Sequence, residues 1–158
     1  MGYNYAVLGA GRQGTACAYD MLKRGEAERV VLADQSSEVA QAAAARVKDL
    51  LATDRVQGIQ LDVTDHHALV QALKGVDAFL SAVPYHLNLA ITRAAIEAKS
   101  SMCDLGGKTD LVREQLTLDR EARAAGISIV PDCGQVPGMG TTLMVYAMSL
   151  LDEAEEVL

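Results

Sequence analysis

The sequence predicts an α/β protein with a doubly wound parallel sheet of about six strands and helices on both faces. Short apolar runs alternate along the 158 residues with segments whose apolar residues recur at helical spacing. Half of the residues are hydrophobic but only 4% are aromatic, which suits small-residue helices packed on parallel strands. Because strand–helix–strand connections are right-handed, this alternation places helices on both faces of one sheet.

Strands are expected where short apolar runs are bounded by turn residues. They cover residues 5–8, 29–33, 58–63, 76–83, 101–105 and 127–130. The run at 76–83 is continuous enough for a central strand, and Pro131 stops the last one.

Helices are expected between these strands and after the last one. Apolar residues at helical spacing mark them within residues 12–24, 39–50, 69–73, 87–98, 111–125 and 141–151. Residues that suit helix ends support these positions: Ser36 or Ser37, Asp65 and Thr141 can cap helix starts, and Gly25 is placed to end the first helix.

Composition excludes several classes of partner. The formal net charge is −7, and no cluster of Lys and Arg is present, which argues against nucleic acid and against an anionic membrane surface. No apolar run approaches the ~18–20 residues of a membrane-spanning helix, and no signal peptide is evident. The odd, widely spaced Cys17, Cys103 and Cys133 are typical of reduced thiols in a cytoplasmic protein and match no metal-ligand pattern.

Residues 9–14 form the pattern G-x-G-x-x-G between the first strand and the first helix. Gly9 permits the tight turn, Gly11 lets the backbone approach a pyrophosphate, and Gly14 allows close packing of helix and strand. The helix start at Arg12 and Gln13 offers N–H groups to the phosphates. This context predicts a Rossmann-type dinucleotide site, the alternative being a glycine turn that only joins strand to helix.

Asp34 closes the second strand, 20 positions beyond Gly14. A carboxylate at that position accepts hydrogen bonds from the adenosine ribose hydroxyls and repels a 2′-phosphate. The next three residues, Gln35, Ser36 and Ser37, include no arginine to hold that phosphate, so NAD is favoured over NADP. A plain helix-capping role is the alternative, and Ser36 and Ser37 already supply caps.

Two further segments are candidates for cofactor contacts. Asp62 and Val63 close the third strand, where an adenine lies in this fold, although an Asp in a turn is an equally good interpretation. Ala82 and Pro84 follow the fourth strand beside the point where the strand order reverses, which is where ligands bind. The small side chain of Ala82 lets a cofactor ribose pass close to the backbone.

Four residues are candidates for the substrate side. Tyr85 and His86 follow the fourth strand, and a histidine there can serve as a general base, although the pair can equally start a helix. Asp104 and Asp132 end neighbouring strands, where either can bind a substrate ammonium group or cap a loop. Cys133 is expected to pack, because hydride transfer from an amine needs no covalent thiol.

Three motifs resemble the saccharopine dehydrogenase family. They are VDAFLSAVPY at 76–85, DLGGKTD at 104–110 and VPDCGQVPGM at 130–139. Within that family the chain is most similar to the L-lysine 6-dehydrogenase branch. The resemblance implies an amino-acid oxidoreductase, homo-oligomeric at full length, with a Rossmann domain followed by a substrate domain. Residues 1–150 then form the dinucleotide-binding domain, and residues 151–158, which look like a further strand starting at 155, begin a truncated second domain.

The leading hypothesis is therefore an NAD-dependent oxidoreductase whose small-molecule substrate is an amino acid. The resemblance implies hydride transfer from the carbon that bears a lysine-type amine, with saccharopine or a related secondary amine as second choice. The alternative is a stand-alone nucleotide sensor without catalysis, because such domains also carry G-x-G-x-x-G and an acid after the second strand. A sensor has no evident need for the motifs at 104–107 and 131–134.

Overall fold

Six parallel strands form one sheet in the computed structural model, which describes residues 2–156. The strands are β1 (Tyr3–Leu8), β2 (Ala27–Asp34), β3 (Val56–Gln60), β4 (Ala78–Ser81), β5 (Ser101–Asp104) and β6 (Ile129–Val130). Their order is β3-β2-β1-β4-β5-β6, so the direction of winding reverses between β1 and β4. This is the strand order of a doubly wound dinucleotide-binding fold, and the predicted fold class is confirmed.

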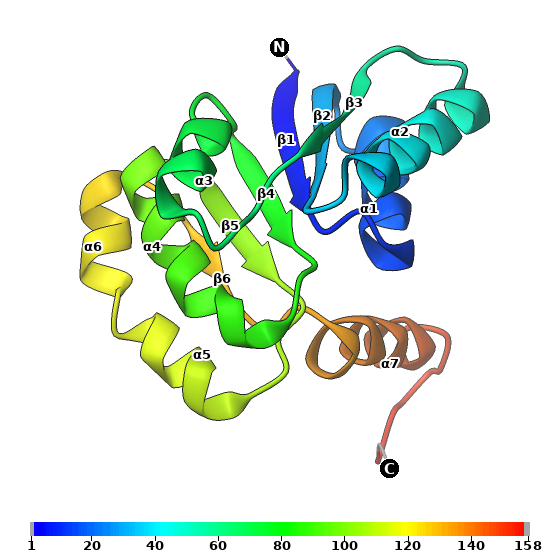
Figure 1. Ribbon diagram of the computed structural model, residues 1–158. Coiled ribbons are helices and arrows are strands. Elements are labelled where there is room, and N and C mark those ends of the chain that lie inside the picture. Colours follow the sequence, from blue (N-terminus) through cyan, green and yellow to red (C-terminus); the bar gives the residue numbers. More distant parts are fainter. Residues whose placement is uncertain (1, 157–158) are drawn as a thin grey trace.

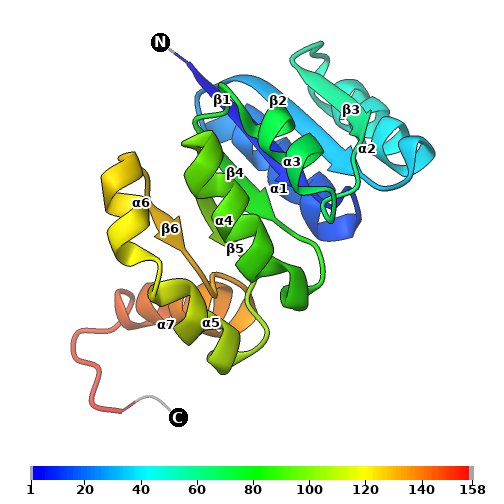
Figure 2. The same ribbon diagram turned by 60° about the vertical axis from the view of Figure 1, so that its left-hand side comes forward.

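Helices cover both faces of the sheet. They are α1 (Arg12–Arg24), α2 (Ser37–Leu51), α3 (His66–Leu73), α4 (Asn88–Ala98), α5 (Thr109–Leu116), α6 (Asp119–Ala125) and α7 (Gly140–Met148), with the short turns η1 (Tyr85–Leu87) and η2 (Gln135–Met139). Figure 1 shows α1 and α2 on one side of the strands, α3 to α6 on the other, and α7 beyond the carboxyl ends. In Figure 2, α3 and α4 lie side by side over the sheet.

Two apolar cores follow from the alternation of side chains along the central strand. Ala6 and Leu8 of β1 are buried in the core beneath α3 and α4. Val7, between them, is buried in the opposite core with Ala18 of α1 and Ala40 of α2. Successive side chains of a strand point to opposite faces, so β1 belongs to both cores and its carboxyl end is held in the middle of the molecule.

Three of the predicted helix ends are confirmed, those at Ser36, Asp65 and Gly25. The Ser36 hydroxyl accepts a hydrogen bond from the Val39 N–H at 3.3 Å, and the Asp65 carboxylate accepts one from the Ala68 N–H at 3.0 Å. Gly25 ends α1 and donates its N–H to a carbonyl of the last turn. These caps satisfy backbone groups that a helix end leaves without a partner.

The single helix predicted over residues 111–125 is wrong. The chain breaks between α5 and α6, where the Thr117 hydroxyl donates to the Glu114 carbonyl at 2.7 Å. Leu118 then leaves the helical region of φ and ψ and is buried. A threonine that bonds the backbone of the preceding turn offers the chain an alternative to the next helical bond, which explains why apolar spacing alone did not locate the break.

Other predicted helix and strand boundaries also differ from those in the structure. Thr141 lies inside α7, which starts at Gly140 and ends at Met148, so its predicted capping role is wrong. The third and fourth strands end at Gln60 and Ser81, earlier than expected. Residues 155–156 form no strand, and the rest of the strand predicted there, 157–158, lies outside the described residues. Within residues 2–156 no helix is long and apolar enough to cross a membrane.

Two buried hydroxyl groups differ in their hydrogen bonds. Thr92 of α4 donates to the Asn88 carbonyl at 2.8 Å and accepts from the Gln115 side chain at 3.0 Å. The Ser100 hydroxyl is equally buried but has no hydrogen-bond partner within residues 2–156. A buried polar group without a partner is costly, whereas a paired one is costly to remove.

We therefore expect opposite effects from two hydroxyl deletions. Thr92→Val should lower the free energy of unfolding by about 1–3 kcal/mol, because it leaves one of the two N–H groups of the buried Gln115 amide without an acceptor. Ser100→Ala should leave stability unchanged or raise it by about 1 kcal/mol. Urea denaturation followed by circular dichroism measures both, and a Ser100→Ala variant as unstable as Thr92→Val would contradict this account.

Candidate functional site

Two glycines of the loop after β1 are required by the packing of the protein itself. Gly9 has a φ of +94°, and a side chain there would meet the Ala82 carbonyl oxygen at 2.7 Å. A side chain on Gly14 would overlap the Gly9 carbonyl oxygen. The turn role of Gly9 and the close-packing role of Gly14 therefore match the structure, and they bring the start of α1 against the end of β4.

Gly11 differs from both, because nothing in the protein requires a glycine at this position. Its φ of −69° and ψ of −168° are open to any residue, and a Cβ here would meet no atom within 4 Å. The N–H groups of residues 12–14 donate no hydrogen bond within residues 2–156, and the first turn of α1 contains no acid. The helix N-terminus beside Gly11 is thus open and its first N–H groups are available, as the predicted pyrophosphate contact requires, and that contact stays a prediction.

Replacing Gly11 should separate nucleotide binding from folding. We expect Gly11→Val to keep the circular dichroism spectrum and melting temperature of the wild type but to lose NADH binding, because the valine occupies the space of the phosphates. Gly14→Ala is the matched variant, and it should unfold at lower temperature because its methyl group overlaps the Gly9 carbonyl. A folded Gly11→Val protein with undiminished affinity for NADH would show that the loop is only a turn.

Asp34 joins the end of β2 to the glycine loop. One carboxylate oxygen accepts the Ala10 N–H at 2.9 Å and the other accepts the Ser36 N–H at 3.0 Å. Each oxygen of a carboxylate has two acceptor positions, so both can still accept ribose hydroxyls. The helix-capping alternative does not describe this residue, because the Ser36 hydroxyl caps α2.

Asp62 and Val63 lie in a turn after β3. One Asp62 oxygen accepts both the N–H of Thr64, at 2.9 Å, and its hydroxyl, at 2.7 Å. These bonds lower the pKa of the exposed Asp62 carboxyl below its ordinary value. Val63 packs against the core beneath α3. The turn that the sequence allowed is therefore formed, and a contact with adenine stays a prediction.

The end of β4 lies directly beside the glycine loop. The Ala82 N–H donates to the Leu8 carbonyl at 2.8 Å, so β1 and β4 continue side by side to the point of reversal. Pro84 is exposed and precedes η1. The half-buried Ala82 and the glycine loop thus flank the position where a dinucleotide crosses the sheet in this fold.

Tyr85 and His86 are exposed at the same edge. They form η1, as the alternative interpretation of the sequence had it, and their rings meet edge to face with centroids 6.0 Å apart. A side chain on Gly107 would meet the Tyr85 ring at 2.9 Å. The structure therefore brings Tyr85 against the loop after β5, in reach of a ligand at the carboxyl edge.

The two candidate aspartates occupy different environments. Asp104 is fully buried, and one of its oxygens accepts the N–H groups of Gly106, at 2.7 Å, and of Asp132, at 2.9 Å. Its second oxygen accepts the Gln115 amide at 2.8 Å. Asp104 thus fills the loop-capping role that the sequence left open. Asp132 is half-buried with a φ of +63°, and its carboxylate forms no hydrogen bond within residues 2–156.

The Gln115 amide is the part of this arrangement that sequence reasoning missed. It is buried on α5, within a segment interpreted only through its apolar residues. A polar residue at a position facing the sheet would have been the signal, because buried amides need hydrogen-bond partners. Nothing local in the sequence says that the partner is Asp104.

The two cysteines near this edge have thiols whose pKa values are raised. Partial burial and the carboxylates of Asp104 and Asp132 raise the pKa of the Cys133 thiol. Burial, with smaller contributions from neighbouring thiols and Asp104, raises the pKa of Cys103 to about 11. Cys133 is exposed, so its predicted packing role is wrong. Within residues 2–156 no three His, Cys, Asp or Glu side chains are grouped to hold a metal.

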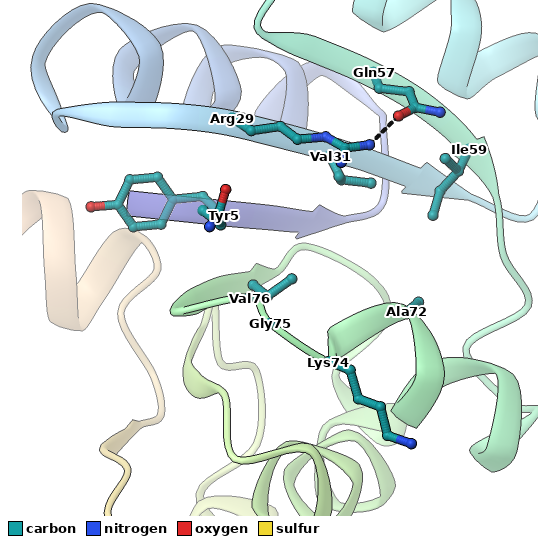
Figure 3. A pocket seen from close by; sticks show the side chains of 10 residues that line it. Tyr5, Arg29, Val31, Gln57, Ile59, Ala72, Lys74, Gly75 and Val76 are labelled. Atoms are coloured by element: carbon teal, nitrogen blue, oxygen red, sulfur yellow. Dashed lines mark hydrogen bonds between the residues drawn. The ribbon is translucent and has the colours of Figure 1, made fainter. Parts of the chain in front are cut away.

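A hollow lies away from the glycine loop, toward the amino ends of the strands. It has a volume of about 340 Å³ and is lined by side chains of β1 to β3, by the end of α3 and by residues 74–76. Figure 3 shows Arg29 turned along the strands to Gln57, whereas the Lys74 side chain points away from them. None of the residues predicted to bind cofactor or substrate lines this hollow, so it is separate from the site.

Strand order, open glycine loop and the acid after β2 together define a dinucleotide-binding domain of the NAD(P) type. The chain belongs to the family described as saccharopine dehydrogenase NADP binding domain, whose model matches residues 5–130. The predicted family is thereby confirmed, while the lysine 6-dehydrogenase branch stays a prediction.

Individual relatives agree with this family. The chain is 29% identical over 153 residues to the NADP⁺, L-glutamate-forming saccharopine dehydrogenase of Saccharomyces cerevisiae, covering 97% of this chain and 31% of that protein. The apo structure of the yeast enzyme superposes with a TM-score of 0.73 at 26% identity, covering 94% of this chain and 31% of that one. The chain thus spans about a third of this relative.

A more distant structure shares the fold. Quinate dehydrogenase from Corynebacterium glutamicum, solved with NAD, superposes with a TM-score of 0.59 at 21% identity, over 81% of this chain and 43% of that one. At this identity the likeness concerns the fold alone.

Proposed function

We propose that this chain is the NAD-binding domain of an amino-acid oxidoreductase that acts on a lysine-type amine. The observation that carries the proposal is the open space at Gly11 beside the exposed N–H groups of α1, in a chain whose family is that of saccharopine dehydrogenases. When bound, NAD supplies a hydride acceptor for the carbon that bears the amine. The amine nitrogen then forms the double bond to that carbon and releases its proton.

NAD is the preferred cofactor in this proposal, although the family description and the yeast relative both mention NADP. The Asp34 carboxylate sits where the adenosine ribose is recognised, held by the Ala10 and Ser36 N–H groups. A 2′-phosphate would bring a second negative charge against it. Two like charges about 4 Å apart repel by ~1 kcal/mol in water and by ~4 kcal/mol near a protein surface.

Replacing Asp34 by asparagine should narrow the preference for NADH over NADPH. We expect wild type to bind NADH more tightly than NADPH, and Asp34→Asn to reduce the ratio of the two affinities about tenfold, the equivalent of ~1.4 kcal/mol. Asparagine keeps one acceptor oxygen for the loop, so the change tests charge more than shape. Isothermal titration calorimetry measures all four affinities, and wild-type binding of NADPH as tight as that of NADH would refute the NAD preference.

The substrate side of the proposal rests on the carboxyl ends of β4 to β6. Asp132 is the better candidate for the substrate ammonium group, because its carboxylate is half-buried and unbonded within residues 2–156, whereas all Asp104 oxygens are engaged. Tyr85 and His86 lie at the same edge as candidates for accepting the proton of the amine. L-Lysine is the first choice of substrate and saccharopine the second.

Further residues would form the second wall of this site. The apolar side chains of Val136, Leu143 and Tyr146 are each more than half exposed on η2 and α7, although a helix that is apolar all round normally packs on several sides. We propose a following substrate domain, begun by residues 151–158, that covers this edge. Such a wall orients the amine, a contribution that can reach ~7–11 kcal/mol in well-oriented systems.

The 158-residue chain alone should therefore bind NADH but form no NADH from lysine or saccharopine. Absorbance at the NADH band follows turnover, and calorimetry on the same sample confirms that the cofactor binds. The control is a longer protein of this sequence that includes the following domain, which should oxidise one of the two amines. Turnover by the short chain at a comparable rate would place the whole active site within these residues and refute the two-domain part of the proposal.

A further inference from the structure

The loops after β5 and β6 are fastened together by a single buried side chain. Asp104 has no exposed surface, and one of its oxygens accepts N–H groups from both loops, from Gly106 at 2.7 Å and from Asp132 at 2.9 Å. The backbone adds one more connection, from the Cys133 N–H to the Asp104 carbonyl at 2.8 Å. A short carboxylate bond to each loop fixes where both leave the sheet.

The second Asp104 oxygen extends this fastening into the helices. It accepts the Gln115 amide at 2.8 Å, and the same amide nitrogen donates to the Thr92 hydroxyl at 3.0 Å. Thr92 donates in turn to the Asn88 carbonyl at 2.8 Å. A series of buried polar groups thus runs from the end of β5 through α5 to α4.

The series ends at β4. The Ser81 hydroxyl donates to the Asn88 side-chain oxygen at 2.8 Å, and both residues are buried. Ser81 is the last residue of β4 and directly precedes the Ala82 that borders the glycine loop. Three strand ends, those of β4, β5 and β6, are consequently connected through one set of hydrogen bonds whose central member is Asp104.

The residues held in this way face the open edge of the sheet. A side chain on Gly106 would overlap the Asp132 carboxylate, and one on Gly107 would meet the Tyr85 ring. Both glycines have positive φ, at +70° and +133°. Asp132, Tyr85 and the two glycines therefore interlock, and their mutual positions depend on the bonds that Asp104 accepts.

The position of this set in the sheet indicates which part of a dinucleotide it concerns. A doubly wound sheet has two mononucleotide-binding halves that meet where the strand order reverses. The glycine loop and Asp34 belong to the half of β1 to β3, which takes the adenosine side. Every member of the Asp104 set belongs to the half of β4 to β6, which takes the nicotinamide side.

We propose that Asp104 is a positioning residue that shapes the nicotinamide end of the site without touching the cofactor. This inference rests on the proposed function, because it needs a chain that binds NAD. It differs from that function in assigning the recognition of one half of the cofactor to a buried carboxylate that acts through the loops after β5 and β6. The adenosine half should then be independent of Asp104.

Comparing two ligands tests this separation. NADH carries both halves, whereas ADP-ribose carries the adenosine, the phosphates and a ribose without nicotinamide. We expect wild type to bind NADH more tightly than ADP-ribose. Asp104→Ala should lower the affinity for NADH about tenfold or more and change that for ADP-ribose less than twofold. Asp104→Asn, which keeps one acceptor oxygen for the two loops, should retain most of the NADH affinity and also remains informative where the alanine variant does not fold.

Asp77 supplies a matched control. Its carboxylate also accepts a backbone N–H from another strand, that of Asn4 in the neighbouring β1 at 2.7 Å, but it lies just before the amino end of β4, away from the site edge. Asp77→Ala should lower the melting temperature and leave the ratio of the NADH and ADP-ribose affinities unchanged. A ratio shifted equally by Asp77→Ala and Asp104→Ala would show a general loss of stability and overturn the positioning role.

The remaining outcomes separate this inference from the proposed function. A wild-type chain that binds neither ligand would overturn the proposed function itself. A wild-type chain that binds both equally, or folded Asp104 variants with the wild-type ratio, would overturn only the role of Asp104. Selective loss of NADH affinity with rescue by Asp104→Asn is the result that supports it.

Discussion

The structure depends on the close approach of two backbones where the strand order reverses. Gly9 turns against the Ala82 carbonyl, and Gly14 presses the start of α1 onto the same turn. A side chain at either glycine would push α1 away from β4, and the helix N-terminus would no longer point at the crevice between the two halves. The predicted anion site at Gly11 depends on this contact for its position, because the packing of Gly9 and Gly14 sets where the first turn of α1 lies relative to the end of β4.

The two halves of the sheet use different means to hold their loops. In the half of β1 to β3, glycines and the Asp34 carboxylate hold one tight turn, and nearly all of the contacts are made by backbone. In the half of β4 to β6, a buried carboxylate and a buried amide hold the loops instead. Burying these groups is tolerable only because each finds partners. The loop of the first half is therefore held mainly by backbone packing, whereas the loops of the second half depend on a complete set of buried hydrogen bonds.

The sequence predicted what is encoded locally. The doubly wound class follows from alternating strands and helices with right-handed connections, the caps at Ser36 and Asp65 from short polar side chains, and the glycine turn after β1 from three glycines at fixed spacing. The helix break at Thr117 was not predicted, because a single side-chain hydrogen bond to the backbone outweighed the apolar spacing. The different environments of Asp104 and Asp132 were not predicted, because the hydrogen bond from the Asp132 N–H to the Asp104 carboxylate joins residues 28 positions apart.

Under the proposed function, Asp34 has two roles, in the choice of cofactor and in the geometry of the glycine loop. Its bond to the Ala10 N–H holds the glycine loop, and its charge disfavours a phosphate on the ribose. A cationic replacement that welcomed the phosphate would lose the acceptor for Ala10, so a change of cofactor at this position also requires a different way to hold the loop. Under the proposed function, selection between NAD and NADP is coupled to the conformation of the glycine loop, and family members that differ at this position are expected to differ in the loop contacts as well.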